Sequence, residues 1–382
     1  MEYRHMERPG WDVSTLSFGC MRFADPDSAA AAVKQAIKLG VNYFDVAPGY
    51  GGGTAESFLA GGLEGEDRSK LIITAKSSPG NGGDGIGEYN PVIGFGIRTA
   101  DEARRQVERS MGLLKVDHLD CYHLWAVHAD IAFEEAMKPG GFLEGIQQAR
   151  DEGLFDHIGI TSHMDSAGLI RYLEEFPFEV VTIPFHLRDT SRAKAVAYCA
   201  ERGIGVIAMI PLAGGAMASK SVALKKTVQE LGFETPVEAA LRYLISYPGV
   251  HTALAGITFA DQAVENSMAV EKGNISHEVA AALHERIHEL YANIQHFCTA
   301  CGYCGECPQG ILIPQVLEAY SNLLVPSQAE EALEDLAARW ASSPEGFDPS
   351  VCTACGECES KCPNKLPISQ LMADAATRWP SG

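Results

Sequence analysis

Eight of the eleven cysteines stand in two short runs in the last quarter of the chain. Each run is followed by a proline, and the second run has the spacing C-x2-C-x2-C-x3-C-P. In this pattern three thiolates bind three irons of one cubane cluster, while the fourth cysteine ligates a neighbouring cluster. The first run has one residue fewer before its last cysteine, which leaves the iron partner of that cysteine open. We therefore predict two [4Fe-4S] clusters, bound by Cys298, Cys301, Cys304, Cys307, Cys352, Cys355, Cys358 and Cys362.

Zinc and disulfide bonds are the other interpretations of these cysteines. A structural zinc site usually takes its four ligands as two separated pairs, whereas each run here has four in close succession and ends in Cys-Pro. Disulfides belong to oxidising compartments, and the first ten residues, MEYRHMERPG, contain no apolar segment that would direct export. Iron–sulfur ligation is therefore favoured, and we expect a cytoplasmic protein.

Length and charge limit the possible organisation and partners. A chain of 382 residues exceeds what one core usually supports, so we expect a barrel-sized domain over residues 1–290 and an iron–sulfur domain over 291–382. The formal net charge of −20 argues against nucleic acid or an anionic membrane as a partner. A protein that donates or accepts electrons would instead present a basic face. No apolar segment reaches the length of a membrane span.

Predicted strands and helices, which must position the catalytic residues, alternate along the first two thirds of the chain. Stretches with helical spacing of apolar residues separate short apolar runs, and eight strand–helix units are typical of a parallel (β/α)8 TIM barrel, with a doubly wound open sheet as the alternative. The tail should be a smaller, mainly helical ferredoxin-like domain. The expected strands are 15–19, 41–46, 71–75, 119–124, 157–161, 180–183, 205–209 and 250–255. The expected helices include 28–39, 100–114, 141–151, 191–201 and 236–246, and in the tail 277–295, 312–324 and 328–341.

The glycine-rich stretch 79–96 is too long for an ordinary strand-to-helix turn. It is either a mobile loop of the active site or a tolerated surface insertion, and we favour the loop.

Nearly the whole chain resembles the aldo-keto reductase family, and specifically those members with a ferredoxin-like tail. The resemblance lies in the order and spacing of several segments, namely LSFGCMRF, NYFDVAPGYGGGTAE, RSMGLLKVDHLDCY, HIGITSH, MIPLAGG and DQAVEN. It implies hydride transfer between a nicotinamide cofactor and the carbonyl of a small-molecule substrate, or the reverse oxidation of an alcohol.

By the resemblance, Tyr50 is the general acid, and Lys76 and Asp45 assist it. A phenol with an ordinary pKa near 10 relays protons poorly at neutral pH, and an adjacent ammonium lowers that pKa. The alternative is that Tyr50 caps a turn while Lys76 neutralises a buried Asp45.

The family has a histidine as the fourth catalytic residue, and the alignment puts Trp125 at that position. An indole N–H can donate one hydrogen bond to a carbonyl oxygen but cannot accept a proton. His123 lies two residues earlier, on the same face of the strand but one layer deeper, and His128 could return from the following loop. His163 and His186 also follow strands, so a metal site at the barrel mouth is a minor alternative.

The resemblance also implies a site for NAD(P)H. Thr161 and Ser162 would contact the nicotinamide carboxamide, Met209 would stack on the ring, and Glu265 and Asn266 would contact the adenine. The positions for cations at an NADP 2′-phosphate fall near Gly256 and Gln262, which are uncharged, so a preference for NADP is not supported. Met209 could equally be apolar barrel lining.

Nicotinamide transfers two electrons as hydride, whereas a [4Fe-4S] cluster accepts one, and the sequence contains no recognisable flavin motif. Three functions remain open at this point. In the first, the barrel is a carbonyl reductase, and the clusters are structural or transfer electrons to an unrelated partner. In the second, the tail feeds electrons to a substrate in the barrel without nicotinamide. In the third, the chain is an electron-transfer or redox-sensing module with a degenerate barrel site.

Overall fold

The structure is a computed structural model of the chain. It describes residues 1–81, 85–218, 221–294, 296–299, 302, 304–325, 334, 336, 346–362 and 364–379. Contacts divide the chain into two compact units, one comprising Met1–Pro211 and Ala240–Ser276, the other Leu212–Ala239 and His277–Gly382. The second unit thus takes in a segment that follows a barrel strand as well as the cysteine-rich tail. The expected domain boundary after residue 290 stays a prediction.

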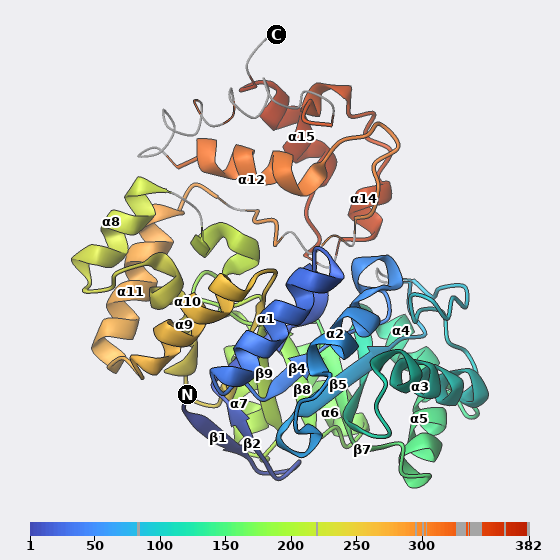
Figure 1. Cartoon of the computed structure of the whole chain (residues 1–382). Helices are drawn as coiled ribbons and strands as arrows, with labels where there is room; N and C mark the ends of the chain where they lie inside the picture. Colours follow the sequence, from blue (N-terminus) through green and yellow to red (C-terminus); the bar gives the residue numbers. More distant parts are fainter. Residues whose placement is uncertain are drawn as a thin grey trace. The chain divides into compact units, whose positions relative to one another are not determined.

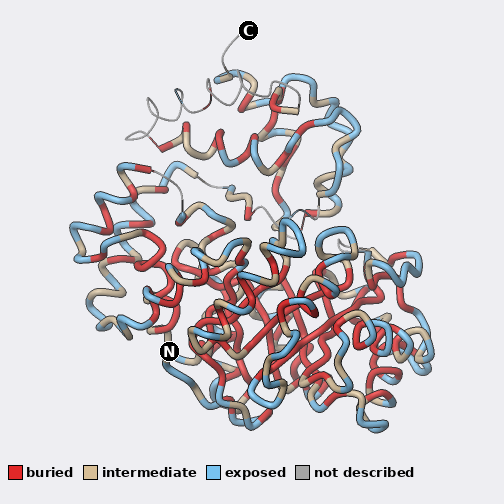
Figure 2. Tube along the Cα trace, in the orientation of Figure 1, coloured by how far each residue is buried: buried red, intermediate tan, exposed pale blue. Residues whose placement is uncertain are grey.

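Eight parallel strands close into a barrel, which confirms the predicted fold class. All eight expected strands are present, in the order β10-β3-β4-β5-β6-β7-β8-β9. Buried residues run along these strands (Figure 2), because a parallel sheet covered by helices is buried on both faces. The strands are β3 Leu16–Gly19, β4 Tyr43–Asp45, β5 Ile72–Ser77, β6 Leu119–Val127, β7 Phe155–Ser162, β8 Val180–Pro184, β9 Gly205–Met209 and β10 Thr252–Gly256.

Helices pack on the outside of the strands (Figure 1). The helix after β5 begins at a capping box, in which Thr99 accepts from the Glu102 amide and Glu102 accepts from the Thr99 amide. Its buried residues recur every three to four positions, and none of its charged residues is buried. The helices that follow strands in this unit are α1 Pro26–Lys38, α2 Ala55–Leu63, α3 Ala100–Leu114, α4 Asp130–Met137, α5 Phe142–Asp151, α6 Ser166–Glu175, α7 Ala193–Ala200 and α10 Ala260–Glu271, while α9 Pro236–Ile245 begins in the second unit.

An antiparallel hairpin, β1 Tyr3–Met6 and β2 Trp11–Ser14, precedes the barrel and was not expected from the sequence. Met6 and Val13 lie in one buried cluster with Tyr43, Ile72 and other residues from the amino ends of the strands. The hairpin therefore closes that end of the barrel. Its strands have four residues each and are partly exposed, so their apolar periodicity is too short to be informative.

The tail is helical in the parts that are described. Its core is formed mainly by α12 Ile313–Leu323 and α15 Ile368–Ala376, and five of the predicted cluster ligands pack against that core. The expected helix 277–295 ends earlier, at Leu290, where the chain tightens into a turn. The expected helix 328–341 lies outside the described residues, except for Glu334 and Leu336. The remaining helices are α8 Val222–Glu230, α11 His277–Leu290 and the short α14 Glu357–Ser360.

Within the described residues, no helix combines the length and apolar character that a membrane crossing requires.

Candidate functional site

Asp45, Tyr50 and Lys76 meet at the carboxyl end of the barrel. Asp45 is the last residue of β4, and Lys76 lies near the end of the neighbouring strand β5. The Lys76 ammonium is ion-paired with the Asp45 carboxylate, and both side chains are almost completely buried. Lys76 Nζ lies 5.1 Å from the centroid of the Tyr50 ring, within the range of a cation–π contact.

Tyr50 reaches this position through a tight turn. It opens the 3-10 helix Tyr50–Gly53, in which Gly51 and Gly52 have φ values of 57° and 65°. Such left-handed angles cost glycine little and other residues more. The run YGGG therefore allows the chain to reverse directly after β4 and leaves Tyr50 half-buried at the barrel mouth.

Trp125 stands at an irregularity in β6. The pairing of β6 with β7 shifts between Leu124 and Val127, and Ala126 has a φ of 55°. A bulge of this kind redirects side chains at the end of a strand. The Trp125 ring meets the Tyr50 ring edge-on, with centroids 5.6 Å apart, so the tryptophan lies beside Tyr50.

The glycine-rich stretch 79–96 contributes to the same site. Phe95 stacks on Trp125 with ring centroids 4.4 Å apart and is buried. The amide of Ser78 donates to the carbonyl of Gly94, which holds this end of the loop against β5. The end of the stretch thus reaches the candidate site through Phe95, which was not predicted from the sequence.

His123 lies deeper in the barrel than Trp125. It pairs with Lys76 in the sheet register and is completely buried, and a Cβ added to Gly159 would lie 2.5 Å from its ring. Burial, with a smaller contribution from Lys76, lowers the pKa of His123 to about 3. Its imidazole is therefore neutral at physiological pH. Neither ring nitrogen has an ordinary hydrogen-bond partner among the described residues, although the Ile160 main chain slightly favours the charged form.

The other histidines near the mouth, His128, His163 and His186, are buried. His128 and His163 are buried and meet edge-on at 4.7 Å. Burial lowers the pKa of His186 to about 4. No group of three or more potential ligands among His, Cys, Asp and Glu is positioned for a metal ion in the described part of the chain.

Thr161 and Ser162, the residues proposed to contact the nicotinamide, differ in whether their hydroxyl groups already make hydrogen bonds within the protein. Ser162 Oγ donates to the carbonyl of Val127 at 2.6 Å and accepts from the Met164 amide. Thr161 Oγ1 is buried and has no hydrogen-bond partner among the described residues, and the same holds for Thr182, its partner in the sheet register. A buried hydroxyl without a partner is costly, so Thr161 fits a polar group of a ligand better than Ser162 does.

The residues assigned to the rest of the dinucleotide lie on β9 and α10. Met209 is half-exposed at the end of β9, Glu265 is exposed, and Asn266 is buried. Gln262 Oε1 accepts from the amides of Thr258 and Phe259 and so caps α10.

A cation that the sequence analysis missed lies at this edge of the barrel. A Cβ added to Gly256 would lie 3.1 Å from Cγ of Arg22, so the Arg22 stem packs against that glycine. Arg22 is distant in sequence from the positions examined for cations, and only closure of the barrel by β10 and β3 brings it there.

Three cysteines from the two runs line one cavity in the second unit. Cys298 and Cys304 come from the first run and Cys362 from the second, and apolar residues such as Ile313 and Leu317 complete the lining. Burial and then the neighbouring Cys362 raise the pKa of the Cys304 thiol. Cys301 lies outside the described residues. The donor set and its apolar surroundings fit a cubane cluster in which the last cysteine of one run ligates the cluster of the other.

The remaining cysteines also gather on the core of this unit. Cys307, Cys352 and Cys358 pack against it, whereas Cys355 is exposed. The pKa of Cys358 is raised to about 11, mainly by burial and then by Glu359, with smaller contributions from Cys304 and Cys355. Residues of the two runs are therefore close in space.

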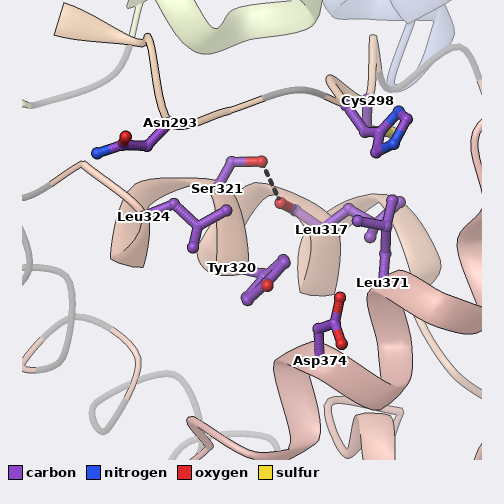
Figure 3. Close-up of a pocket in the computed structure, with 9 residues that line it drawn as sticks. Asn293, Cys298, Leu317, Tyr320, Ser321, Leu324, Leu371 and Asp374 are labelled. Carbon is purple, nitrogen blue, oxygen red and sulfur yellow. Dashed lines mark hydrogen bonds between the residues drawn. The ribbon is translucent and has the colours of Figure 1, made fainter.

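A second cavity, of about 170 Å³, lies between α12, α15 and the segment that leads to Cys298 (Figure 3). Cys298 borders this cavity as well. Tyr320 and Asp374 line it from the two helices, and Ser321 Oγ donates to the carbonyl of Leu317 within α12.

Family models match both parts of the chain. The model of the aldo/keto reductase family matches residues 15–287, and that of the 4Fe-4S dicluster domain matches residues 297–366.

Among curated proteins, the chain is 26% identical over 300 residues to an L-galactose dehydrogenase of Arabidopsis thaliana, an alignment that covers 71% of this chain and 88% of that protein. It is 22% identical over 306 residues to an uncharacterized oxidoreductase, YqkF, of Bacillus subtilis, covering 74% and 95%. Among solved structures, an aldo-keto reductase of Bacillus halodurans in its holo form superimposes with a TM-score of 0.63 at 23% identity, covering 75% of this chain and 96% of that one. At this identity the structural likeness shows the barrel fold alone.

Proposed function

The chain belongs to the aldo/keto reductase family and is an oxidoreductase with an iron–sulfur domain, and from its site we propose that it reduces a carbonyl compound, or oxidises the alcohol, with NAD(P)H in the barrel. The two [4Fe-4S] clusters of the tail would transfer electrons, in exchange with a partner protein that presents a basic face to this acidic chain.

The buried Lys76–Asp45 pair beside Tyr50 is the observation that carries the proposal. An ammonium group taken out of water is stable only with a counter-ion, and the Asp45 carboxylate is that counter-ion. Thr74 Oγ1 also donates a hydrogen bond of 3.4 Å to this carboxylate. The charged Lys76 favours the phenolate of a tyrosine near it, so Tyr50 can release a proton to the developing alkoxide of the substrate.

Nicotinamide supplies the hydride when it is bound. Thr161, with its buried hydroxyl that has no described partner, would orient the carboxamide, and Met209 would cover the ring. Asn266 and Glu265 would hold the adenine. Trp125 and Phe95 would shield the substrate side from water and give the pocket an aromatic wall.

The protein, purified without oxygen, should oxidise NADH or NADPH in the presence of at least one member of a panel of aldehydes and ketones. Tyr50→Phe should lower this rate at least 100-fold, because positioned general acids contribute about 10²–10⁴-fold. Tyr43→Phe is the matched control, since Tyr43 opens β4, the strand that precedes Tyr50 in the chain, and lies in the cluster at the amino end of the barrel. It should leave the rate unchanged.

Two results would replace the proposal. If no nicotinamide binds in a fluorescence titration, and a carbonyl compound reoxidises dithionite-reduced clusters, the tail feeds electrons to the substrate directly. If Tyr50→Phe and Lys76→Met leave every electron-transfer rate unchanged, the chain acts as an electron-transfer or sensing module.

A further inference from the structure

Cys298 and Cys362 line the same cavity, and a hydrogen bond joins the chain segments that follow these two cysteines. Thr299 follows Cys298, and Asn364 lies two residues beyond Cys362. Asn364 Nδ2 donates to Thr299 Oγ1 at 2.9 Å, and Thr299 is buried, with 6% of its surface exposed. Both residues belong to the lining of the cavity that contains the two cysteines.

The main chain of Thr299 is in turn backed by a glycine from a distant part of the sequence. Gly214 has a φ of 69°, and a Cβ added to it would lie 2.3 Å from the Thr299 carbonyl oxygen and 2.4 Å from its carbonyl carbon. Contacts this short exclude any side chain unless the main chain of Thr299 moves. Gly214 lies in the 3-10 segment Ala213–Ala218, which follows β9 in the chain and belongs to the second unit.

These contacts hold together the chain segments that follow Cys298 and Cys362 at the cavity. We propose that Thr299, Asn364 and Gly214 are positioning residues that set the reduction potential of the cluster held by Cys298, Cys304 and Cys362. The inference rests on the proposed ligation by these cysteines, but not on any activity of the barrel.

The physical reason is the charge of the cluster. Reduction adds one negative charge, and water stabilises the more highly charged form, so solvent exposure is one of the properties that set the potential. An apolar lining that keeps water away from the cluster disfavours the reduced state. Loosening the Thr299 segment admits water and raises the potential.

The source of Gly214 gives this arrangement a further consequence. The segment Ala213–Ala218 is matched by the aldo/keto reductase family model and not by the dicluster model. Residues of the reductase sequence, a few positions after Met209 on β9, therefore form part of the surroundings of one cluster. The reduction potential of that cluster thus depends on residues from both ranges, the one matched by the aldo/keto reductase model and the one matched by the dicluster model.

The first test removes the hydrogen bond. In the full-length protein with both clusters, a potentiometric titration with dithionite, followed by electron paramagnetic resonance, gives two midpoints. Thr299→Val should raise one of them, changing the reduced-to-oxidised ratio of that cluster about threefold, which is ~28 mV for one electron. The other midpoint should stay in place, and Thr299→Ser, which keeps the hydroxyl, should restore the wild-type value. Equal shifts in Val and Ser, or none in either, would overturn the role of the bond.

The second test uses two adjacent glycines. Gly214→Ala forces a methyl group against the Thr299 main chain and should raise the same midpoint as Thr299→Val. Gly215→Ala is the control, because Gly215 also has a positive φ, of 108°, but nothing lies within 4 Å of its added Cβ. Loss of about four irons in Gly214→Ala alone would also support the proposal. Identical midpoints and iron contents in both alanine variants would refute it.

Both tests are independent of the proposed reductase activity. A protein that reduces no carbonyl compound can still show the shifts, and a protein with full activity can lack them.

Discussion

Glu56 should make the barrel lose stability as the pH rises through the acidic range. It lies on α2 with 1% of its surface exposed, and its carboxylate makes no hydrogen bond of ordinary geometry with the described residues, although Ser110 is close enough to act on it. Gln106 and Ser110 on α3 are also buried with side-chain atoms that have no described partner. Burial raises the pKa of Glu56 to about 7, against the weaker opposing effects of Ser110 and Arg109.

The sign follows from proton binding. Between the ordinary pKa of 4.5 and the folded value of about 7, the folded protein keeps the Glu56 proton and the unfolded chain does not. The contribution of Glu56 to the free energy of unfolding is therefore highest below pH 4.5. It falls by about 1.4 kcal/mol per pH unit between pH 4.5 and pH 7 and levels off above pH 7. The contribution lost between pH 5 and pH 8 is about 2.5 kcal/mol.

Glu56→Gln removes the titrating group and should remove this slope. Native-state hydrogen exchange of the full-length protein, read by mass spectrometry on peptides from α2 and α3 and corrected for intrinsic exchange rates, gives the opening free energy at both pH values. Glu64→Gln, an exposed glutamate at the end of the same helix, is the control and should keep the wild-type slope. If the change in opening free energy between pH 5 and pH 8 differs by less than about 0.5 kcal/mol between Glu56→Gln and wild type, Glu56 does not keep its proton in the folded protein.

Three further outcomes are expected. Lys76→Met leaves the Asp45 carboxylate buried without its counter-ion and should destabilise the protein by about 3–5 kcal/mol, most of which Asp45→Asn in the same chain should recover in thermal unfolding. Trp125→Phe keeps the aromatic wall but removes the indole N–H, so a drop of about tenfold in kcat with unchanged NAD(P)H affinity would indicate a hydrogen bond to the substrate oxygen, and an unchanged kcat would exclude it. Cys362→Ser should reduce iron from about eight to about four atoms per chain, and retention of all eight would contradict its assignment as a ligand.

The architecture of the barrel was accessible from the sequence because its signals are local. A buried parallel strand is a short apolar run, and a covering helix repeats its apolar residues every three to four positions. All eight barrel strands were placed this way. The N-terminal hairpin was missed because four-residue, half-exposed strands have too few positions to show a period.

The site was predictable where it depends on strand ends. Asp45 and Lys76 lie at the carboxyl ends of neighbouring strands, which parallel pairing brings together. Phe95 was missed because the stacking on Trp125 depends on the course of a glycine-rich loop, and no periodicity encodes that course. Arg22 reaches Gly256 only because the first and last barrel strands pair.

The sequence by itself determined the order of strands and helices and the family, and it predicts the cysteine ligands, because spacing and periodicity are properties of neighbouring residues. Only the tertiary structure decided what surrounds them: the burial that raises the pKa of Glu56, the bulge that sets Trp125 beside Tyr50, and the packing of Gly214 on Thr299. Each of these depends on contacts between residues far apart in the chain, which burial and close packing establish only once the chain has folded.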